Sequence, residues 1–145
     1  MQDFMPLAVQ FAKNHTLLIA AWVAIFLMVV YQLFQAATVK VKLISNAQAT
    51  SLINNQDAVV IDLRSPDEFK HGHIAGSQQF LPTDIKTQNL GKLEHHKDTP
   101  VILVCANGAA SRTSANILAK NKFSRVYVLN EGIAGWKNAN LPLVK

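Results

Sequence analysis

The chain contains a single cysteine, Cys105, among its 145 residues. It can therefore form no disulfide within itself, and a reducing compartment would keep this thiol free. Internal repeats and low-complexity segments are also missing, and acidic residues are scarce, with 9 Asp and Glu against 14 Lys and Arg. The basic residues form neither a run nor a patch interleaved with aromatic residues, which argues against nucleic-acid binding. A mildly basic, solvated surface suits small anionic substrates instead.

The longest apolar run of the sequence is Leu17–Tyr31, and it continues through Leu33 and Phe34 after a single Gln32. At about 1.5 Å per residue, a helix of this length covers most of a hydrocarbon core roughly 30 Å thick. The run has no polar face, which argues against a core helix of a globular domain. The residues that follow it form a poor cleavage site, which argues against a signal peptide. We therefore expect an uncleaved membrane anchor in contact with the lipid bilayer.

This anchor divides the chain into four parts. We expect a short N-terminal tail over residues 1–16, a transmembrane helix over 17–34, a juxtamembrane linker over 35–42 and one globular domain over 43–145. Lys13 precedes the span, and Lys40 and Lys42 follow it. Because positive charge favours the cytoplasmic side, we expect a single-pass protein with its C-terminal domain in the cytoplasm. The single free thiol agrees with that orientation.

The globular part alternates short apolar strands with helices, which predicts a parallel sheet covered by helices on both faces. The expected strands are 58–62, 79–81, 100–104 and 124–129, and the expected helices are 45–54, a short one from 66, 82–96 with a break near 91, 111–121 and 132–138. In such sheets ligands bind at the carboxyl ends of the strands. Asp62 and Cys105 both stand at such ends, so we expect Asp62, Arg64 and the loop after Cys105 to lie together.

Cys105 follows an apolar strand and opens a loop of small residues, namely Ala106, Asn107, Gly108, Ala109 and Ala110, before a helix begins. The sulfur should then face the N-terminus of that helix, where unpaired N–H groups and the helix dipole favour an anion. Small side chains leave the loop N–H groups free to surround it, and Gly108 can adopt a positive φ. A thiolate stabilised in this way is the reactive form of cysteine. The alternative, a structural cysteine that packs as a small hydrophobe, fits this setting less well.

Four ordered motifs resemble those of the rhodanese family, and the resemblance covers the chain after Leu43. They are Asp62-Leu63-Arg64, the ten residues from Glu68 to Ser77 built around Gly-His-Ile-Ala-Gly-Ser, the six-residue loop from Cys105 to Ala110, and the segment from Glu131 to Trp136. The last of these resembles the family's Gly-Gly-x-x-Ala-Trp element, with departures at Glu131 and Gly135. An anchor joined to such a domain is similar to the membrane-anchored rhodaneses of the bacterial inner membrane.

The resemblance implies a sulfurtransferase. In this family the loop cysteine takes sulfane sulfur from a donor, becomes a persulfide and passes the sulfur to a nucleophilic acceptor. Carried over to this chain, Cys105 would be catalytic, Arg64 and residues 106–110 would bind substrate, and Asp62, His73 and Arg112 would support the loop. Asp62 and Arg64 are equally consistent with an ordinary strand-end ion pair. The implied partners are a small anionic donor and a thiol or cyanide-like acceptor, and no cofactor is implied.

The last loop position departs from the family pattern. Many active relatives have Arg or Thr there, which helps to bind an anionic donor such as thiosulfate, and this chain has Ala110. The departure leaves a second function open, namely a weakly active or inactive rhodanese-type module that binds a protein partner in the membrane. A phosphatase is disfavoured, because the related cysteine phosphatases place Arg six residues after the cysteine. Ser111 stands at that position, and Arg112 comes one residue later.

Two pairs of histidines raise the question of a metal site. His73 belongs to the Gly-His-Ile turn, which the family uses structurally, and His71 lies two residues before it. His95 and His96 stand in a segment rich in Lys and Glu, which is typical of a solvated surface. With one cysteine and no further cluster, we expect no metal centre.

Overall fold

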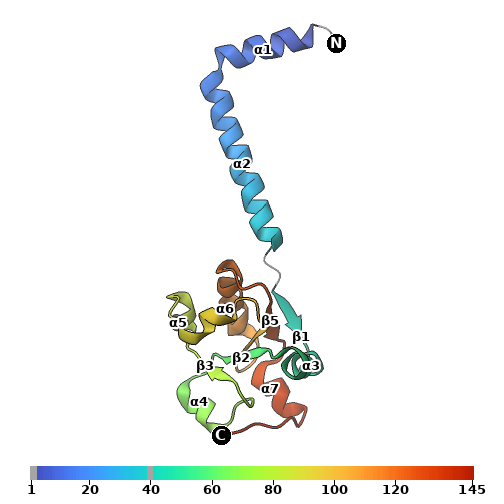
Figure 1. Cartoon of the computed structure of the whole chain (residues 1–145), viewed down its shortest axis with the longest axis vertical. Helices are drawn as coiled ribbons and strands as arrows, with labels where there is room; N and C mark the ends of the chain where they lie inside the picture. Colours follow the sequence, from blue (N-terminus) through green and yellow to red (C-terminus); the bar gives the residue numbers. More distant parts are fainter. Residues whose placement is uncertain (1–2, 39–40) are drawn as a thin grey trace. The chain divides into compact units, whose positions relative to one another are not determined.

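The computed structural model describes residues 3–38 and 41–145 of the chain. These residues separate into two compact units, which lie within Met1–Thr38 and Val39–Lys145. Each unit has its own secondary structure (Figure 1) and is described by itself.

The first unit consists of two helices, α1 (Phe4–Asn14) and α2 (Thr16–Thr38). Within α2, the 19 residues Thr16–Phe34 have a mean hydropathy of 2.4, and none of them is buried. A helix of that length measures roughly 28 Å, close to the thickness of a hydrocarbon core. By length and composition α2 is thus suited to cross a membrane. The helical structure of α1 is an addition to the prediction, which had only a tail over residues 1–16.

The second unit contains a five-stranded sheet in the order β1-β5-β4-β2-β3, with every neighbouring pair parallel. The strands are β1 (Lys42–Ile44), β2 (Val59–Asp62), β3 (Gln78–Gln79), β4 (Val101–Val104) and β5 (Val126–Leu129). The predicted parallel α/β sheet is confirmed, and β4 is its central strand. All four residues of β4 are buried, which explains why that strand is apolar without alternation.

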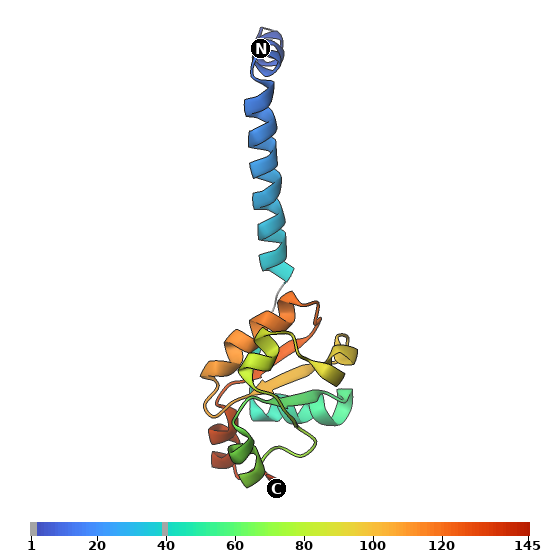
Figure 2. The ribbon, with the colours of Figure 1, turned by 90° about the vertical axis from the view of Figure 1, so that its left-hand side faces the viewer.

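Helices cover both faces of this sheet (Figure 2). On one face, α5 (Pro82–Lys86) and α6 (Ala109–Lys120) pack on Leu103 of β4. On the other face, α3 (Asn46–Gln56) and α7 (Gly132–Asn138) pack on Val104. Successive β4 residues point to opposite faces, so a single strand contributes to both halves of the core.

Two helices begin with capping boxes that the sequence encodes. Ser45 caps α3 together with Gln48, and Ser65 caps α4 (Pro66–His71) together with Glu68. In each case the serine hydroxyl accepts the third helical N–H, and the longer side chain accepts the N–H of the serine. The predicted starts of these two helices are therefore correct to within a residue.

Several boundaries differ from the prediction. Strand β1 begins at Lys42, the last residue of the predicted linker, of which residues 39–40 lie outside the described part of the chain. Strand β3 is 78–79 rather than 79–81. In place of the predicted helix over 82–96, the structure has the short α5 followed by a 3₁₀ helix, η1 (Gly91–His96). The helix is interrupted because Gln88 and Gly91 adopt positive φ angles of 60° and 50°. Helix α6 begins at Ala109, two residues earlier than predicted, because Gly108 forms its N-cap.

Candidate active site

The ends of β2 and β4 meet at one edge of the sheet. Asp62 is paired with Val104, and the N–H of Leu63 donates to the carbonyl of Val104 at 2.8 Å. The residue after β4 is Cys105 and the second residue after β2 is Arg64, so both strand ends lead into the same neighbourhood. The expectation that these ends lie together follows from parallel pairing and agrees with the structure.

Cys105 is 4% exposed, and its sulfur accepts a hydrogen bond from the N–H of Gly108 at 3.0 Å. This contact closes the loop on itself at the N-terminus of α6. Gly108 has a φ of +89°, and a Cβ atom at this position would fall on the carbonyl oxygen of Asn130, which follows β5. Both the left-handed backbone and the close approach to Asn130 therefore require glycine at residue 108.

Two opposing influences set the pKa of the Cys105 thiol. Burial, the largest single influence, raises it, but hydrogen bonds from the Ser111 hydroxyl and from the N–H groups of Ser111, Asn107 and Gly108 together lower it below its ordinary value. Ser111 is fully buried in the first turn of α6, and in the described residues its hydroxyl has no partner that meets ordinary hydrogen-bond geometry. The hydroxyl therefore has no competing partner in the described residues, and its influence on the Cys105 thiol lowers the pKa.

Sequence reasoning used Ser111 only to argue against a phosphatase and missed this position beside the sulfur. A signal was present in the sequence, because a small hydroxyl residue in the first turn of the helix after a cysteine loop faces back toward that loop.

The N-terminus of helix α7 donates hydrogen bonds to the loop that begins at Cys105. The N–H of Ile133 donates to the carbonyl of Cys105 at 2.9 Å, and the N–H of Ala134 donates to the carbonyl of Ala106 at 3.1 Å. These donors are among the N–H groups that a helix N-terminus leaves unpaired. Gly132 has a φ of +59°, and a Cβ atom there would fall on the Cys105 carbonyl oxygen. Two loop carbonyls that would repel a bound anion are thereby engaged with α7.

Asp62 and Arg64 form a buried ion pair, with side chains 1% and 6% exposed. Arg64 Nη2 donates to Asp62 Oδ2 at 2.7 Å and to the carbonyl of Gly72 at 2.7 Å, while Arg64 Nε donates to Asp62 Oδ1 at 3.0 Å. Because most of the guanidinium donors are used within the protein, the pair connects the end of β2 to the turn at Gly72. The strand-end ion pair considered from the sequence is therefore present.

His73 stabilises the same turn. Its Nδ1 lies 2.9 Å from the carbonyl oxygen of Phe69, and its ring stacks on the Phe69 ring with centroids 3.8 Å apart. Its backbone forms an antiparallel bridge with Val144 near the C-terminus. His73 thus connects α4, the turn at Gly72 and the C-terminal segment.

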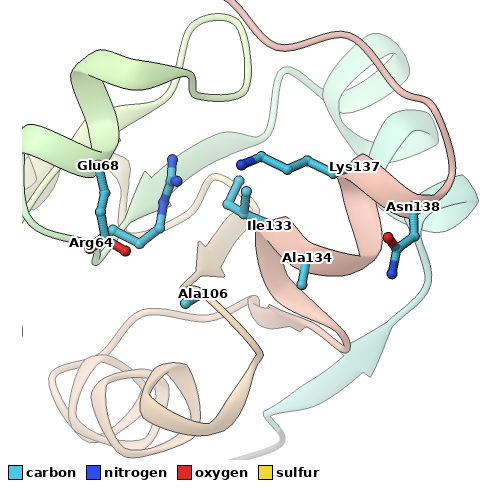
Figure 3. Close-up of a pocket in the computed structure, with 7 residues that line it drawn as sticks. All are labelled: Arg64, Glu68, Ala106, Ile133, Ala134, Lys137 and Asn138. Atoms are coloured by element: carbon cyan, nitrogen blue, oxygen red, sulfur yellow. The ribbon is translucent and has the colours of Figure 1, made fainter.

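A cavity of about 320 Å³ opens beside the loop, at the lower end of the range for small-molecule sites. Figure 3 shows its lining: Arg64, Glu68, Ala106, Ile133, Ala134, Lys137 and Asn138. The Lys137 side chain extends from α7 toward Arg64 and Glu68. Hydrogen bonds from Ser65, and to a smaller degree the charges of Arg64 and Lys137, lower the pKa of Glu68. Sequence reasoning missed Lys137, because that lysine lies well beyond the recognisable loop motif.

The remaining predicted site residues lie at the surface. Asn107 is exposed, and its side-chain oxygen accepts the N–H of Ala109 at 3.2 Å. Ala109 and Ala110 are exposed in the first turn of α6. Arg112 is also exposed, and within residues 41–145 it makes no hydrogen bond or ion pair with the loop. No group of three potential metal ligands occurs among the described residues.

The chain is similar to several known proteins. The family model for the rhodanese-like domain matches residues 45–139. The chain is 49% identical to the protein YibN of Escherichia coli (strain K12) over 145 residues, which cover 100% of this chain and 99% of YibN, so the likeness includes the N-terminal helices. It is 34% identical to the thiosulfate sulfurtransferase GlpE of Pseudoalteromonas translucida (strain TAC 125) over 98 residues, 68% of this chain and 90% of GlpE. The crystal structure of a rhodanese-related protein from Thermoplasma volcanium superimposes with a TM-score of 0.60 at 25% identity, covering 71% of this chain and 97% of that one.

Proposed function

The chain belongs to the rhodanese-like family, and from this membership we propose that it is a membrane-anchored sulfurtransferase that carries sulfane sulfur as a persulfide on Cys105. The observation that carries the proposal is the hydrogen bonding of the Cys105 sulfur at the start of α6, which lowers the thiol pKa despite burial. A lowered pKa raises the fraction of thiolate, the form that attacks a donor. GlpE, a relative that is 34% identical over 98 residues, is a thiosulfate sulfurtransferase by name.

In the first half-reaction, the Cys105 thiolate attacks the outer sulfur of a donor such as thiosulfate. A new sulfur–sulfur bond forms to Cys105 as the donor's own sulfur–sulfur bond breaks, and sulfite leaves with the electron pair of that bond. The product carries its negative charge on the terminal persulfide sulfur. The N–H groups of the loop are suited to stabilise this charge, because small side chains leave them accessible and the carbonyls of Cys105 and Ala106 are engaged with α7.

In the second half-reaction, an acceptor attacks the terminal sulfur of the persulfide. The electron pair of the Cys105–sulfur bond returns to Cys105, which again becomes a thiolate stabilised by Gly108 and its neighbours. A thiol acceptor leaves as a persulfide, and cyanide leaves as thiocyanate. The same hydrogen bonds therefore serve both half-reactions, since the cysteine thiolate is reactant in the first and leaving group in the second.

We assign donor binding to the cavity beside the loop. Lys137 and Arg64 bring positive charge to its lining, which suits an anionic donor. Most of Arg64's donors are already used by Asp62 and Gly72, so Lys137 is the more available cation. Ala106 lines the cavity on the loop side. In this proposal residues 107–110 supply further contacts to the donor, and Asp62, His73 and Arg112 support the loop.

The proposal places the transmembrane span at residues 17–34, within α2, in a bacterial inner membrane. The lysine bias, with Lys13 before the span and Lys40 and Lys42 after it, favours a cytoplasmic domain. The domain would then meet its donor and acceptor at the cytoplasmic surface of the membrane.

Ala110 favours a second candidate function, a weakly active module that binds a protein partner in the membrane. It is exposed at the loop position where many active relatives carry Arg or Thr, so it brings no charge to the donor. The two functions differ in whether Cys105 becomes a persulfide in the presence of a donor.

The deciding experiment is incubation of the full chain in detergent with thiosulfate, followed by intact-mass measurement and by transfer to cyanide. We expect a mass gain of one sulfur atom on Cys105 and release of thiocyanate. Cys105→Ser should lose both signals while its circular dichroism spectrum and melting temperature stay near those of the parent. Sulfur transfer that persists in Cys105→Ser would refute the assignment, and a parent that never gains sulfur would favour the interaction module.

A further inference from the structure

Helix α1 has one apolar face and one polar face. Phe4, Leu7, Ala8 and Phe11 follow the i, i+3, i+4, i+7 spacing of a helical stripe. The opposite side carries Gln10 and Lys13. Pro6 lies in the first turn, where proline removes no helical hydrogen bond. The segment is thus an amphipathic helix whose apolar side is exposed, apart from the contact of Phe11 with the His15 ring.

The apolar face of α1 is large for a solvent-facing surface. Phe4 is 75% exposed, Leu7 is 65% exposed and Phe11 is 60% exposed. A contiguous exposed apolar surface of this kind marks a site of association with another apolar phase.

The short connection to α2 indicates that this apolar phase is the lipid bilayer. Helix α1 ends at Asn14 and α2 begins at Thr16, so His15 alone separates them. The N–H of His15 donates to the Phe11 carbonyl at 3.0 Å, and the His15 carbonyl accepts from Ile19 at 3.0 Å. The Phe11 and His15 rings also lie in contact, with centroids 4.7 Å apart. With α2 across the bilayer, Thr16 stands at the edge of the hydrocarbon core, and the last turn of α1 has to lie at that edge.

We propose that α1 lies in the interfacial layer of the bilayer that α2 crosses, with Phe4, Leu7 and Phe11 among the upper acyl chains and Gln10 and Lys13 toward water. The inference rests on the proposed membrane anchoring and adds a second attachment to lipid. Interfacial helices are held by buried apolar area and by cationic side chains on anionic lipid. Lys13 is the one cation of α1, so apolar burial is the main contribution, and anionic lipid is not required.

Spin labelling of the full chain tests this placement. Because Cys105 is the only thiol, Cys105→Ser gives a cysteine-free background, into which single cysteines are introduced. Ala8→Cys and Phe11→Cys report on the apolar face, Gln10→Cys reports on the polar face, and Ile25→Cys reports on the middle of α2. Each labelled protein is reconstituted in phosphatidylcholine vesicles, with and without phosphatidylglycerol. Collisions with oxygen, which concentrates in lipid, are compared with collisions with a water-soluble nickel chelate.

We expect oxygen to dominate at Ile25, to dominate less strongly at Ala8 and Phe11, and the nickel chelate to dominate at Gln10, in both kinds of vesicle. Equal nickel exposure at Ala8 and Gln10, with Ile25 still in lipid, would overturn the interfacial placement and leave the anchor intact. A lipid signature at Ala8 that appears only with phosphatidylglycerol would overturn the apolar basis of the attachment. Nickel exposure at Ile25 would instead refute the membrane anchoring itself, and the inference with it.

Discussion

Burial and hydrogen bonding act in opposite directions on the Cys105 thiol. A cysteine that is 4% exposed would ordinarily have a raised pKa, because a thiolate is poorly solvated there. In this loop the donors from Ser111, Asn107 and Gly108 outweigh that effect, so the pKa is lowered. At a fixed pH below the thiol pKa, the thiolate fraction is therefore higher than for an exposed cysteine. The reactivity of Cys105 therefore depends on the hydrogen-bond donors of its loop and of the first turn of α6.

Ser111→Ala should raise the pKa of Cys105, because it removes the hydroxyl contribution and leaves the effect of burial in place. The pH at which alkylation of Cys105 reaches half of its maximal rate should lie below that of a free thiol, about 8.5, in the parent and should move upward in the variant. The rate of alkylation by iodoacetamide, measured at a series of pH values for both proteins, tests this shift in pKa directly.

Ser114→Ala is the matched control, since Ser114 is also buried in α6, one turn further along. It should leave the alkylation profile unchanged. Equal profiles for Ser111→Ala and the parent would mean that the backbone donors alone set the pKa.

Ala110→Arg should improve the use of thiosulfate. A guanidinium at this exposed position in the first turn of α6 can add a charge-assisted contact to the donor, worth about 1.5–3 kcal/mol when well placed. The gain should appear in kcat/KM as roughly ten-fold or more and should shrink as salt concentration rises. Ala109→Arg, at the neighbouring exposed position, controls for the added charge. If both variants improve alike, general attraction rather than a contact at residue 110 is responsible.

At the scale of elements, the two departures from the family's Gly-Gly-x-x-Ala-Trp pattern compensate each other. Glu131 replaces a glycine at the N-cap of α7, and Gly135 replaces the alanine four residues later. A Cβ atom on Gly135 would overlap the Cβ of Glu131 and lie 2.6 Å from its Oε2. The methyl group missing at residue 135 therefore makes room for the side chain at residue 131, and α7 keeps its position against the Cys105 loop.

Gly135→Ala should consequently destabilise the domain by about 1–3 kcal/mol, the usual effect of overpacking. The double variant Glu131→Gly with Gly135→Ala restores the family pattern and should recover most of the loss. Chemical denaturation of all four proteins in the cycle gives the coupling between the sites. Additive effects of the two substitutions would contradict the proposed compensation.

The elements that the sequence predicted well are those whose pattern is determined locally. The run Val101–Val104 is buried on both faces and has the pattern of a central strand, and Ser45 and Pro66 mark the starts of two helices. Strand β1 was missed, because three residues beginning with Lys42 carry no pattern and owe their strand structure to pairing with β5. Lys137 was missed for a similar reason, since its place at the cavity depends on how α7 docks rather than on its neighbours in sequence.

At the scale of the whole molecule, the expected orientation in the membrane depends on three lysines, Lys13, Lys40 and Lys42. We expect the N-terminus outside and Cys105 in the cytoplasm, so a membrane-impermeant thiol reagent should fail to label intact cells and should label permeabilised ones. Because Cys105 is 4% exposed, the reagent must first be shown to react with the folded protein in detergent. Labelling after opening of the outer membrane alone would place the domain in the periplasm.

The lone thiol has a consequence for stoichiometry. A chain without a second cysteine has no resolving group, so a persulfide on Cys105 cannot collapse into an internal disulfide. In the proposed function each chain holds one transferable sulfur atom until an acceptor removes it. Donor and acceptor then react with the same sulfur in turn, which is a ping-pong scheme. Initial-rate measurements at several fixed acceptor concentrations should accordingly give parallel double-reciprocal lines, whereas intersecting lines would mean that both substrates are bound at once.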